Sequence, residues 1–222
     1  MPCDEPEILM QYIVAAAPPF MKNGFLVWCD ETREAVLIDP GDEINDLLRA
    51  VVSERVSVKA ILLTHAHLDH VTGVGPAKAK LNVPAWLHRD DLFLYNRAVE
   101  QGRMFGIDVA LPPPIDAFYE PGVPFRFGRE TVDILHTPGH CPGGVCLAIG
   151  RETSPARELF VGDTLFAGSI GRTDLPGGDY ETLIRSIRTV LFEFPDETVV
   201  HSGHGPDTTI GVERRTNPFL NE

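Results

Sequence analysis

Three histidines and an aspartate fall within six residues, in the run from His65 to His70. Neutral imidazole and carboxylate groups are good ligands for zinc and similar divalent ions. The preceding segment, 59–64, is a short apolar run that predicts a buried strand, and His65 and His67 follow it two residues apart, a spacing that points both rings to one side of an extended chain. A polar surface turn does not explain the run, because clustering histidines without a ligand carries a desolvation and repulsion cost. The run therefore predicts a metal site.

Three later turns each offer one more ligand beside a predicted strand. The expected strands are 131–136, 158–162 and 198–200, and the side chains in the adjoining glycine-containing turns are His140, Asp163 and His204. Loops held by a rigid sheet are the usual place for a site that needs precise geometry. One ion cannot use seven protein ligands and still bind water, whereas two ions can if one carboxylate bridges them. We therefore expect a centre for two metal ions, with seven candidate ligands: His65, His67, Asp69, His70, His140, Asp163 and His204.

The order of these motifs resembles that of the metallo-β-lactamase-fold hydrolases over nearly the whole chain. The resemblance rests on the His-Ala-His-Leu-Asp-His run and on the later Pro-Gly-His, Gly-Asp-Thr and Gly-His-Gly turns. It implies a single domain, residues 1–222, with an α/β fold: a four-layer αββα sandwich of two mixed β-sheets flanked by helices. It also implies the distribution of the ligands, with one ion on His65, His67 and His140, the other on Asp69, His70 and His204, and Asp163 as the bridging carboxylate.

Within that superfamily, the segment 162–168 and the compact length look most like the glyoxalase II branch, which hydrolyses S-acylglutathione thioesters. The resemblance therefore implies a metal-dependent hydrolase of a small-molecule thioester, acting through a hydroxide held between two divalent ions. Zinc is the expected metal, with iron or manganese as alternatives. Asp69 and Asp163 are the expected catalytic carboxylates, the first as an orienting group and proton acceptor and the second as the shared anchor of both ions.

The loop 170–179 carries the candidate substrate contacts. Its glycines allow the backbone to turn close to a ligand, and Arg172 can hold a carboxylate in a bidentate pair. Typical glyoxalase II enzymes use a lysine and a tyrosine in the matching loop, whereas the aligned residues here are Arg172 and Asp174. Such enzymes also carry a helical C-terminal domain, and this chain ends at Glu222. Arg172 and Asp174 are expected either to contact substrate or to pin the loop by an ion pair, which leaves glutathione recognition open.

Alternative functions of the same fold remain. The run 171–174 also resembles persulfide dioxygenases, in which a single iron would occupy the positions of His65, His140 and Asp163. A generalist thioesterase is a further alternative. The complete second ligand set favours the two-metal hydrolase over the dioxygenase and over a non-catalytic metal-binding module. A β-lactamase is less favoured, because those enzymes are secreted and residues 1–7 do not resemble a secretory signal.

Composition narrows the partners and the compartment. The net charge of −13 argues against a nucleic-acid partner, because phosphate binding needs a basic surface. No apolar stretch approaches the length of a membrane span. The four cysteines, Cys3, Cys29, Cys141 and Cys146, show neither zinc-type pairing nor a dense disulfide pattern, which predicts a cytoplasmic protein. Cys141 is expected to be an inert core residue although it adjoins His140. The sequence does not indicate an oligomeric state.

Periodicity and turn residues predict the elements that position these side chains. Strands are expected at 12–17, 25–30, 34–39 and 84–87, with turns at 22–24 and 30–33. Helices are expected at 42–52 (capped by Asp42), 90–102 and 179–194. The proline-rich run 111–114 predicts an extended arm, which together with Met104 and Phe105 is expected to form part of the substrate pocket wall.

Two expectations concern the remaining polar residues. The second nitrogens of the ligating histidines need an acceptor, which Asp39, Thr64 or backbone carbonyls are expected to supply. His88, His136 and His201 match no ligand position of the family and are expected to lie outside the metal site.

Overall fold

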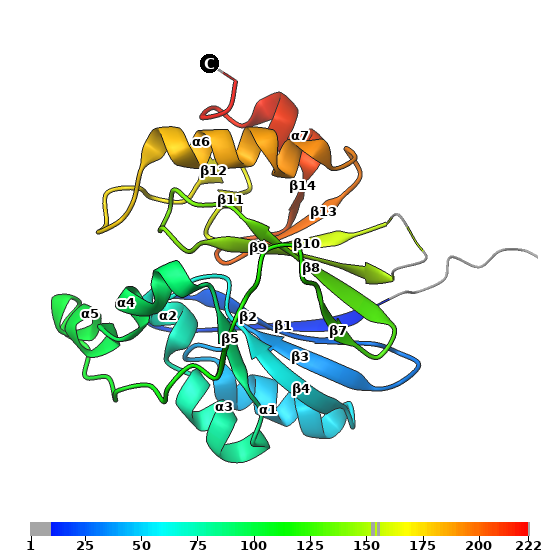
Figure 1. The fold of residues 1–222 in the computed structure, drawn as a ribbon, viewed down its shortest axis with the longest axis vertical. Coiled ribbons are helices and arrows are strands. Elements are labelled where there is room, and N and C mark those ends of the chain that lie inside the picture. Colours follow the sequence, from blue (N-terminus) through cyan, green and yellow to red (C-terminus); the bar gives the residue numbers. More distant parts are fainter. Residues whose placement is uncertain (1–9, 152–153, 155, 222) are drawn as a thin grey trace, which may run out of the picture.

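Two six-stranded β-sheets pack face to face in the computed structural model, and helices cover each outer face (Figure 1). The structure describes residues 10–151, 154 and 156–221, so the acidic start and Cys3 lie outside the described residues. This arrangement confirms the predicted αββα sandwich. Among the described residues, none of the helices has the length and apolar character needed to cross a membrane.

The first sheet is mixed and runs through the N-terminal half of the chain. Its strands, in spatial order, are β1 (Gln11–Ala17), β2 (Lys22–Trp28), β3 (Glu34–Ile38), β4 (Ser57–Leu62), β5 (Ala85–Leu87) and β6 (Ala117–Phe118). Strands β1 to β3 pair antiparallel, and β3 to β6 pair parallel. Successive side chains of β2 alternate between two cores, because strand residues point to opposite faces: Phe25 and Val27 face the second sheet, whereas Leu26 and Trp28 face the outer helices.

The second sheet is also mixed. Its spatial order is β14 (Thr208–Thr209), β13 (Val199–Ser202), β10 (Glu158–Gly162), β9 (Val145–Arg151), β8 (Glu130–His136) and β7 (Phe125–Phe127). Among its described strands, β10 and β13 pair parallel and the other neighbours pair antiparallel. A small separate hairpin, β11 (Leu165–Phe166) and β12 (Ser169–Ile170), follows β10. Val132, Leu147 and Phe160 pack against β2 and β3 between the sheets, which joins the two halves through one apolar layer.

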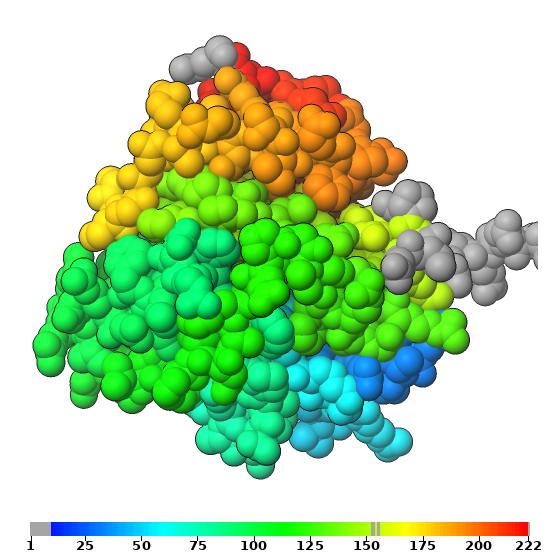
Figure 2. All heavy atoms as spheres, viewed as in Figure 1, coloured from blue at the N-terminus to red at the C-terminus, as the bar shows by residue number. Residues whose placement is uncertain are grey.

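The helices form the outer layers. Helices α1 (Ile44–Ser53) and α3 (Val74–Leu81) cover the first sheet, and α6 (Tyr180–Thr189), the 3-10 turn η2 (Leu191–Glu193) and α7 (Ile210–Thr216) cover the second (Figure 1). The short elements α2 (Leu68–Val71), η1 (Arg89–Asp91), α4 (Leu92–Tyr95) and α5 (Ala98–Met104) lie toward one end of the sandwich. In Figure 2 the yellow segment near residues 170–178 meets the green surface of α4 and α5 at this end.

The predicted turn at 22–24 is wrong, because these residues belong to β2. Their polar groups find partners across the fold rather than in solvent. The Lys22 ammonium is buried against Glu43 at 2.8 Å and also donates to the Asp39 carbonyl. The Asn23 amide donates to the carbonyls of Ser202 and Gly205. These distant partners allow turn-forming residue types to continue a strand.

Three helix predictions also need correction. The helix expected over 179–194 ends at Thr189 as α6 and is followed by the 3-10 turn η2. Asp42 does not cap α1, which begins at Ile44 after Glu43; Asp42 instead accepts a hydrogen bond from the Thr72 hydroxyl. The single helix expected over 90–102 is divided into η1, α4 and α5. The division follows from the Leu94 carbonyl, which accepts from the backbone of Arg97 and from the Gln101 side chain, so that the chain tightens after α4.

Candidate metal centre

All seven predicted ligands come together at one end of the sandwich, on loops that follow strands. The segment 63–71 follows β4, Asp163 follows β10, and His204 lies two residues beyond β13. His140 lies on the loop that joins β8 to β9. Because β10 and β13 are parallel neighbours, their following loops emerge side by side. The sheets therefore position these side chains from segments far apart in the sequence.

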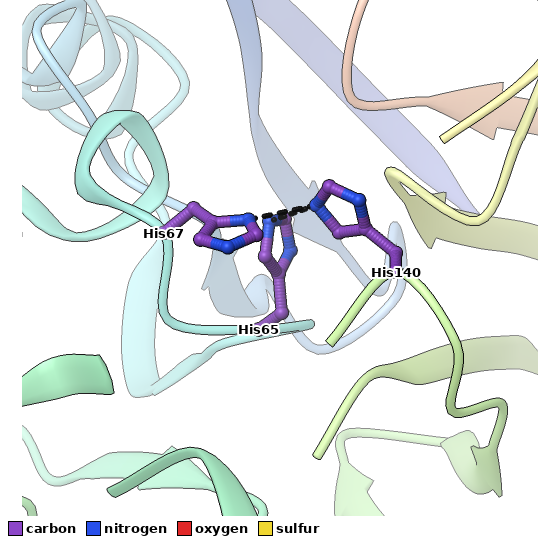
Figure 3. A group of neighbouring side chains, drawn as sticks. All are labelled: His65, His67 and His140. Atoms are coloured by element: carbon purple, nitrogen blue, oxygen red, sulfur yellow. Dashed lines mark hydrogen bonds between the residues drawn. The ribbon is translucent and has the colours of Figure 1, made fainter. Parts of the chain in front are cut away.

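The first set consists of His65, His67 and His140, whose rings point toward one another (Figure 3). His67 Nδ1 lies 2.7 Å from His140 Nε2, which lies 3.3 Å from His65 Nε2. All three side chains are buried, and one ligand nitrogen of each lies within 4.8 Å of the others. This is the distribution that the resemblance implied for the first ion.

The second set consists of Asp69, His70 and His204. Their ligand atoms lie within 4.8 Å of one another, and His204 Nε2 lies 3.1 Å from Asp69 Oδ2. His70 Nε2 is 3.7 Å from the same carboxylate oxygen. One carboxylate and two imidazoles thus converge beside the first set.

Asp163 lies between the two sets. Its Oδ1 is 3.3 Å from His70 Nε2, and its Oδ2 is 3.6 Å from His204 Nε2 and 3.7 Å from His140 Nε2. One carboxylate therefore reaches ligand atoms of both sets, as a bridging group must. The absence of a side chain at Gly203 makes this possible, because a methyl group there would overlap Asp163 Oδ1.

The donor atoms fit divalent ions. His70 Nε2 and Asp163 Oδ1 are buried and face each other at 3.3 Å without a well-directed hydrogen bond, a costly arrangement unless another group binds them. Burial and the neighbouring His140 lower the pKa of His67 to about 3, so its ring is neutral. Burial acts in the same direction on His70, but the carboxylates of Asp163, Asp69 and Asp39 outweigh it and raise the pKa of His70 to about 10. A metal ion bound at His70 must therefore displace a proton.

Thr64 and Asp39 connect the two sets through hydrogen bonds to the histidine nitrogens that face away from the centre. The His65 Nδ1–H group donates to Thr64 Oγ1 at 3.1 Å, and that hydroxyl donates to Asp39 Oδ2 at 2.5 Å. The His70 Nδ1–H group donates to the same Asp39 oxygen at 2.9 Å. Both partners are among those expected from the sequence. Asp39 thus directs the Nε2 atoms of His65 and His70 toward the centre, where the His70 nitrogen becomes a ligand once its proton is lost.

A backbone carbonyl serves the third histidine. His140 Nδ1–H donates to the Arg172 carbonyl at 2.7 Å, which brings the loop 170–179 against the first set. The Arg172 guanidinium forms a bidentate pair with Asp174, with both distances 2.7 Å, and both side chains are more than half exposed. The ion pair lowers the pKa of Asp174 to about 2. The structure therefore contains the loop-pinning pair, while Arg172 also lines the cavity in front of the centre.

Asp91 is a residue that the sequence did not identify. Its buried carboxylate accepts from the Ala66 amide at 3.0 Å, from the Cys141 thiol at 3.1 Å and from the Gly143 amide at 2.6 Å. Ala66 lies between two ligands, and Cys141 directly follows His140, so Asp91 joins both loops of the first set. Within a predicted helix, Asp91 resembled an ordinary charged residue. The thiol is inert in the expected sense, because burial, reinforced by Asp91, raises the pKa of Cys141.

Asp91→Asn is expected to weaken metal binding by the first set by about 10–100-fold, the usual effect of groups that orient ligands. The amide keeps the shape of the side chain but turns a donor toward an N–H or S–H group. Cobalt titration followed by absorption is the measurement, because it separates the two sets. Glu130→Gln, at another buried carboxylate beside Arg151, is the matched control. Equal cobalt affinity in both variants would contradict the positioning role.

The other histidines lie outside the two sets, as expected. His201 is buried between Glu158 at 2.7 Å and Asp207 at 3.0 Å, and its ring stacks on Phe160. His88 and His136 stack on each other. These residues have partners of their own and belong to other parts of the fold.

A cavity of about 190 Å³ opens in front of the centre. Its polar wall comes from the candidate ligands and Arg172, and its apolar wall from Phe20, Leu68, Phe105 and Leu175. A second cavity of about 120 Å³ shares Phe105 and Leu175 and continues along Phe93, Leu94, Met104 and Pro176. Phe105 thus lines the cavity in front of the centre and Met104 lines the adjoining one, so their role in a substrate pocket stays a prediction. The expected role of the arm 111–114 is wrong, because Leu111 and Pro112 line a different cavity with Val71 and Val109.

Comparison with known proteins places this arrangement in a family. The model of the metallo-beta-lactamase superfamily matches residues 17–204. A protein named hydroxyacylglutathione hydrolase GloC from Haemophilus influenzae is 42% identical over 209 residues, which cover 91% of this chain and 94% of that protein. The probable metallo-hydrolase YqgX from Bacillus subtilis is 36% identical, with coverage of 91% and 94%.

Solved structures with the same fold lead to the same family. The BLEG-1 B3 metallo-beta-lactamase superposes with a TM-score of 0.86 at 35% identity and covers 96% of this chain and 100% of its own. The di-iron-bound form of TTHA1623 has a TM-score of 0.82 at 43% identity, with coverage of 94% and 100%. ETHE1 from Myxococcus xanthus has a TM-score of 0.77 at 25% identity, with coverage of 94% and 83%. The fold and the matched family model show that the chain belongs to the metallo-beta-lactamase superfamily and is a metallo-hydrolase.

Proposed function

We propose that this protein hydrolyses small thioesters of the S-acylglutathione type with two divalent metal ions, of which zinc is the first choice. The observation that carries the proposal is Asp163, whose carboxylate reaches both ligand sets beside an open cavity. The 42% identity to a protein named hydroxyacylglutathione hydrolase supports the substrate class. The proposed ligands are the seven residues of the two sets and the bridge.

The chain's own residues position the reactants. Two divalent ions held there would lower the pKa of water and polarise a carbonyl group. Asp39 and Thr64 keep His65 and His70 in one tautomer, so the ligand nitrogens cannot turn away. Asp69 lines the cavity, where its carboxylate is placed to orient the attacking water and hold its proton. The departing thiolate is a good leaving group and needs little acid assistance.

The cavity supports recognition of the acyl side. The apolar wall of Phe20, Phe105 and Leu175 lies beside the candidate ligands and continues into the second cavity. Arg172 is the cationic side chain on the wall of the first cavity, and Asp174 already occupies its guanidinium. A carboxylate of the thiol portion would therefore have to displace Asp174 or bind the Nη1 side of the guanidinium next to the Asp174 charge. We infer that acyl contacts contribute more to specificity than the peptide part of glutathione.

Metal analysis tests the two-metal assignment. The purified protein, loaded with zinc and freed of excess, is expected to hold two ions per chain in this centre, because six donors form two sets of three and Asp163 reaches both sets. Elemental analysis of the iron-, manganese- and zinc-loaded forms is the measurement. Full occupancy by a single iron, with oxygen consumed in the presence of glutathione persulfide, would replace the hydrolase by the dioxygenase alternative. The likeness to ETHE1 makes this comparison necessary.

Substrate choice is tested with two lactoyl thioesters. Lactoylglutathione and the lactoyl thioester of a shorter thiol are expected to have kcat/KM values within about tenfold of each other, a difference of about 1.4 kcal/mol. Steady-state assays under one condition measure the ratio, and Asp174→Ala, which frees Arg172, is expected to shift preference toward lactoylglutathione. A loss of several orders of magnitude with the shorter thiol would contradict acyl-side recognition. Hydrolysis of a cephalosporin without thioester turnover would overturn the substrate class.

A further inference from the structure

The second cavity, of about 120 Å³, adjoins the metal centre directly. His67, a candidate ligand of the first set, lines both this cavity and the one in front of the centre. Gln101, Phe105 and Leu175 also line both. A molecule whose reacting group lies at the centre can therefore extend into the second cavity.

The wall of the second cavity contains large apolar side chains that the fold leaves partly uncovered. Phe93 of α4 is 39% exposed, Met104 at the end of α5 is 70% exposed, and Phe105 is 50% exposed. Leu175 and Pro176 of the loop 170–179 complete this lining, where Figure 2 shows the loop against the surface of α4 and α5. Exposed apolar side chains that surround one hollow are typical of a ligand site.

The polar side chains on this wall favour an apolar occupant as well. The Gln101 amide accepts from the Leu68 N–H at 3.0 Å and donates to the Leu94 carbonyl at 2.9 Å, so the backbone already uses it. Arg97 and Glu100 lie 3.7 Å apart and are mostly exposed, so their charges offset each other in contact with solvent. Burying a polar group without a partner costs free energy, whereas an apolar chain loses nothing by entering such a space.

A thioester held at the centre has two arms, and their chemistry decides which arm suits this cavity. The glutathione arm carries carboxylates, an ammonium group and amides, all of which need polar partners. Arg172, the cationic side chain near the centre, lines the first cavity. The acyl arm is the one that can be wholly apolar beyond its carbonyl group. The second cavity therefore suits the acyl arm, and the thiol arm stays beside Arg172.

We propose, on the basis of the thioester hydrolysis proposed above, that the second cavity binds the acyl chain and that the preferred substrates carry an apolar acyl chain of about six carbons. A volume of about 120 Å³ holds about four water-sized groups at about 30 Å³ each, and a methylene group is close to that size. These groups, together with the carbonyl carbon and the carbon next to it at the centre, make a hexanoyl chain. Phe105 and Leu175, which line both cavities, would contact the chain where it leaves the centre.

Steady-state hydrolysis of acetyl-, butanoyl-, hexanoyl- and octanoylglutathione by the zinc-loaded enzyme tests the proposal. We expect kcat/KM to rise about two- to fourfold for each added methylene as far as hexanoyl, because burial of each methylene stabilises the bound chain, and to rise no further at octanoyl. Acetyl thioesters of ethyl, butyl and hexyl thiols form the second series, in which no such rise is expected. A rise that followed the thiol chain instead of the acyl chain would overturn the proposal, as would equal rates along the acyl series.

Met104→Asp places a carboxylate on the wall of the second cavity, and Leu111→Asp is its matched control. Both native side chains are 70% exposed, and Leu111 lines a different cavity, so neither substitution removes a buried core residue. Met104→Asp is expected to lower the hexanoyl-to-acetyl ratio of kcat/KM by at least about fivefold, because the chain would have to desolvate the new charge. Leu111→Asp is expected to keep the ratio of the unmodified chain. Equal ratios in the two variants would contradict the assignment of the cavity.

Binding of the product carboxylates separates this inference from the proposed function. Calorimetric titration of the zinc-loaded protein with acetate, butanoate and hexanoate is expected to give dissociation constants that fall about two- to fourfold per methylene, and the fall is expected to be smaller in Met104→Asp. Equal binding of acetate and hexanoate would overturn the inference. Thioester turnover without a chain-length preference would also overturn it, while the hydrolase assignment would stand. Tighter binding of hexanoate by a protein that hydrolyses none of the thioesters would overturn the proposed function and support the apolar-chain site.

Discussion

Asp163→Ala is expected to abolish stable binding of both ions and to lower turnover by more than the 10–100-fold that loss of an orienting group causes. The reason is geometric: the carboxylate lies within 3.3–3.7 Å of ligand nitrogens from both sets, so its removal takes a ligand from each ion. Metal content and kcat/KM measured on the same preparation test this expectation.

The matched control for this substitution is Asp133→Ala. Asp133 is a half-exposed carboxylate on β8 that pairs with Arg157 at 3.4 Å, away from the ligand loops. Its loss is expected to leave metal content unchanged. If Asp163→Ala retained two ions per chain and near-normal turnover, the bridging role would be wrong.

Gly203→Ala is expected to remove metal binding although no ligand changes. An added methyl group would overlap Asp163 Oδ1 and lie 3.0 Å from His70 Cε1 and 3.1 Å from the Gly162 carbonyl carbon. The Gly162 backbone cannot move away from the added methyl group, so the Asp163 carboxylate must move instead. We expect a loss of metal affinity of at least about 10–100-fold, together with destabilisation of about 1–3 kcal/mol from overpacking.

The control for Gly203→Ala is Gly75→Ala, in helix α3. The nearest atom to an added methyl group there is Pro113 Cδ at 3.6 Å, an ordinary contact. Alanine also favours a helix, so the free energy of unfolding is expected to rise slightly. Two measurements are made on both variants: zinc affinity, and denaturant unfolding of the metal-free protein. Together they separate a local loss of metal binding from a general loss of stability. Unchanged zinc affinity of Gly203→Ala would show that the carboxylate is not confined by this loop.

The cavity links these predictions to substrate choice. Phe105 lines both cavities in front of the centre. Its ring packs edge-on against that of Phe20, with the ring centroids 5.6 Å apart. Arg172 faces the same space, but its guanidinium is paired with Asp174. The sequence left substrate contact and loop pinning open for this pair, and the geometry adds a specific question: whether a carboxylate ligand can displace Asp174.

The local sequence pattern was sufficient to predict those strands whose residues interact mainly with their neighbours in the chain. The strand 158–162 was predicted correctly, and the strand expected at 59–64 is present two residues earlier, at Ser57–Leu62, because strand periodicity is a property of consecutive residues. Polar residues with distant partners were not predicted correctly. Lys22 and Asn23 are residue types that favour turns, yet they lie in a strand. Glu43 pairs with the Lys22 ammonium, and the carbonyls of Ser202 and Gly205 accept hydrogen bonds from the Asn23 amide.

The sequence by itself determined the types of the seven candidate ligands and, through its resemblance to a family, their expected division into two sets around Asp163. Only the tertiary structure decided how they are held. Asp39 serves His65 through Thr64 and serves His70 directly, the Arg172 carbonyl holds His140, and Asp91 joins the loops of Ala66 and Gly143. These contacts connect residues that are far apart in the chain. Their formation depends on which strands become neighbours, and that in turn depends on the packing of the two sheets rather than on local pattern.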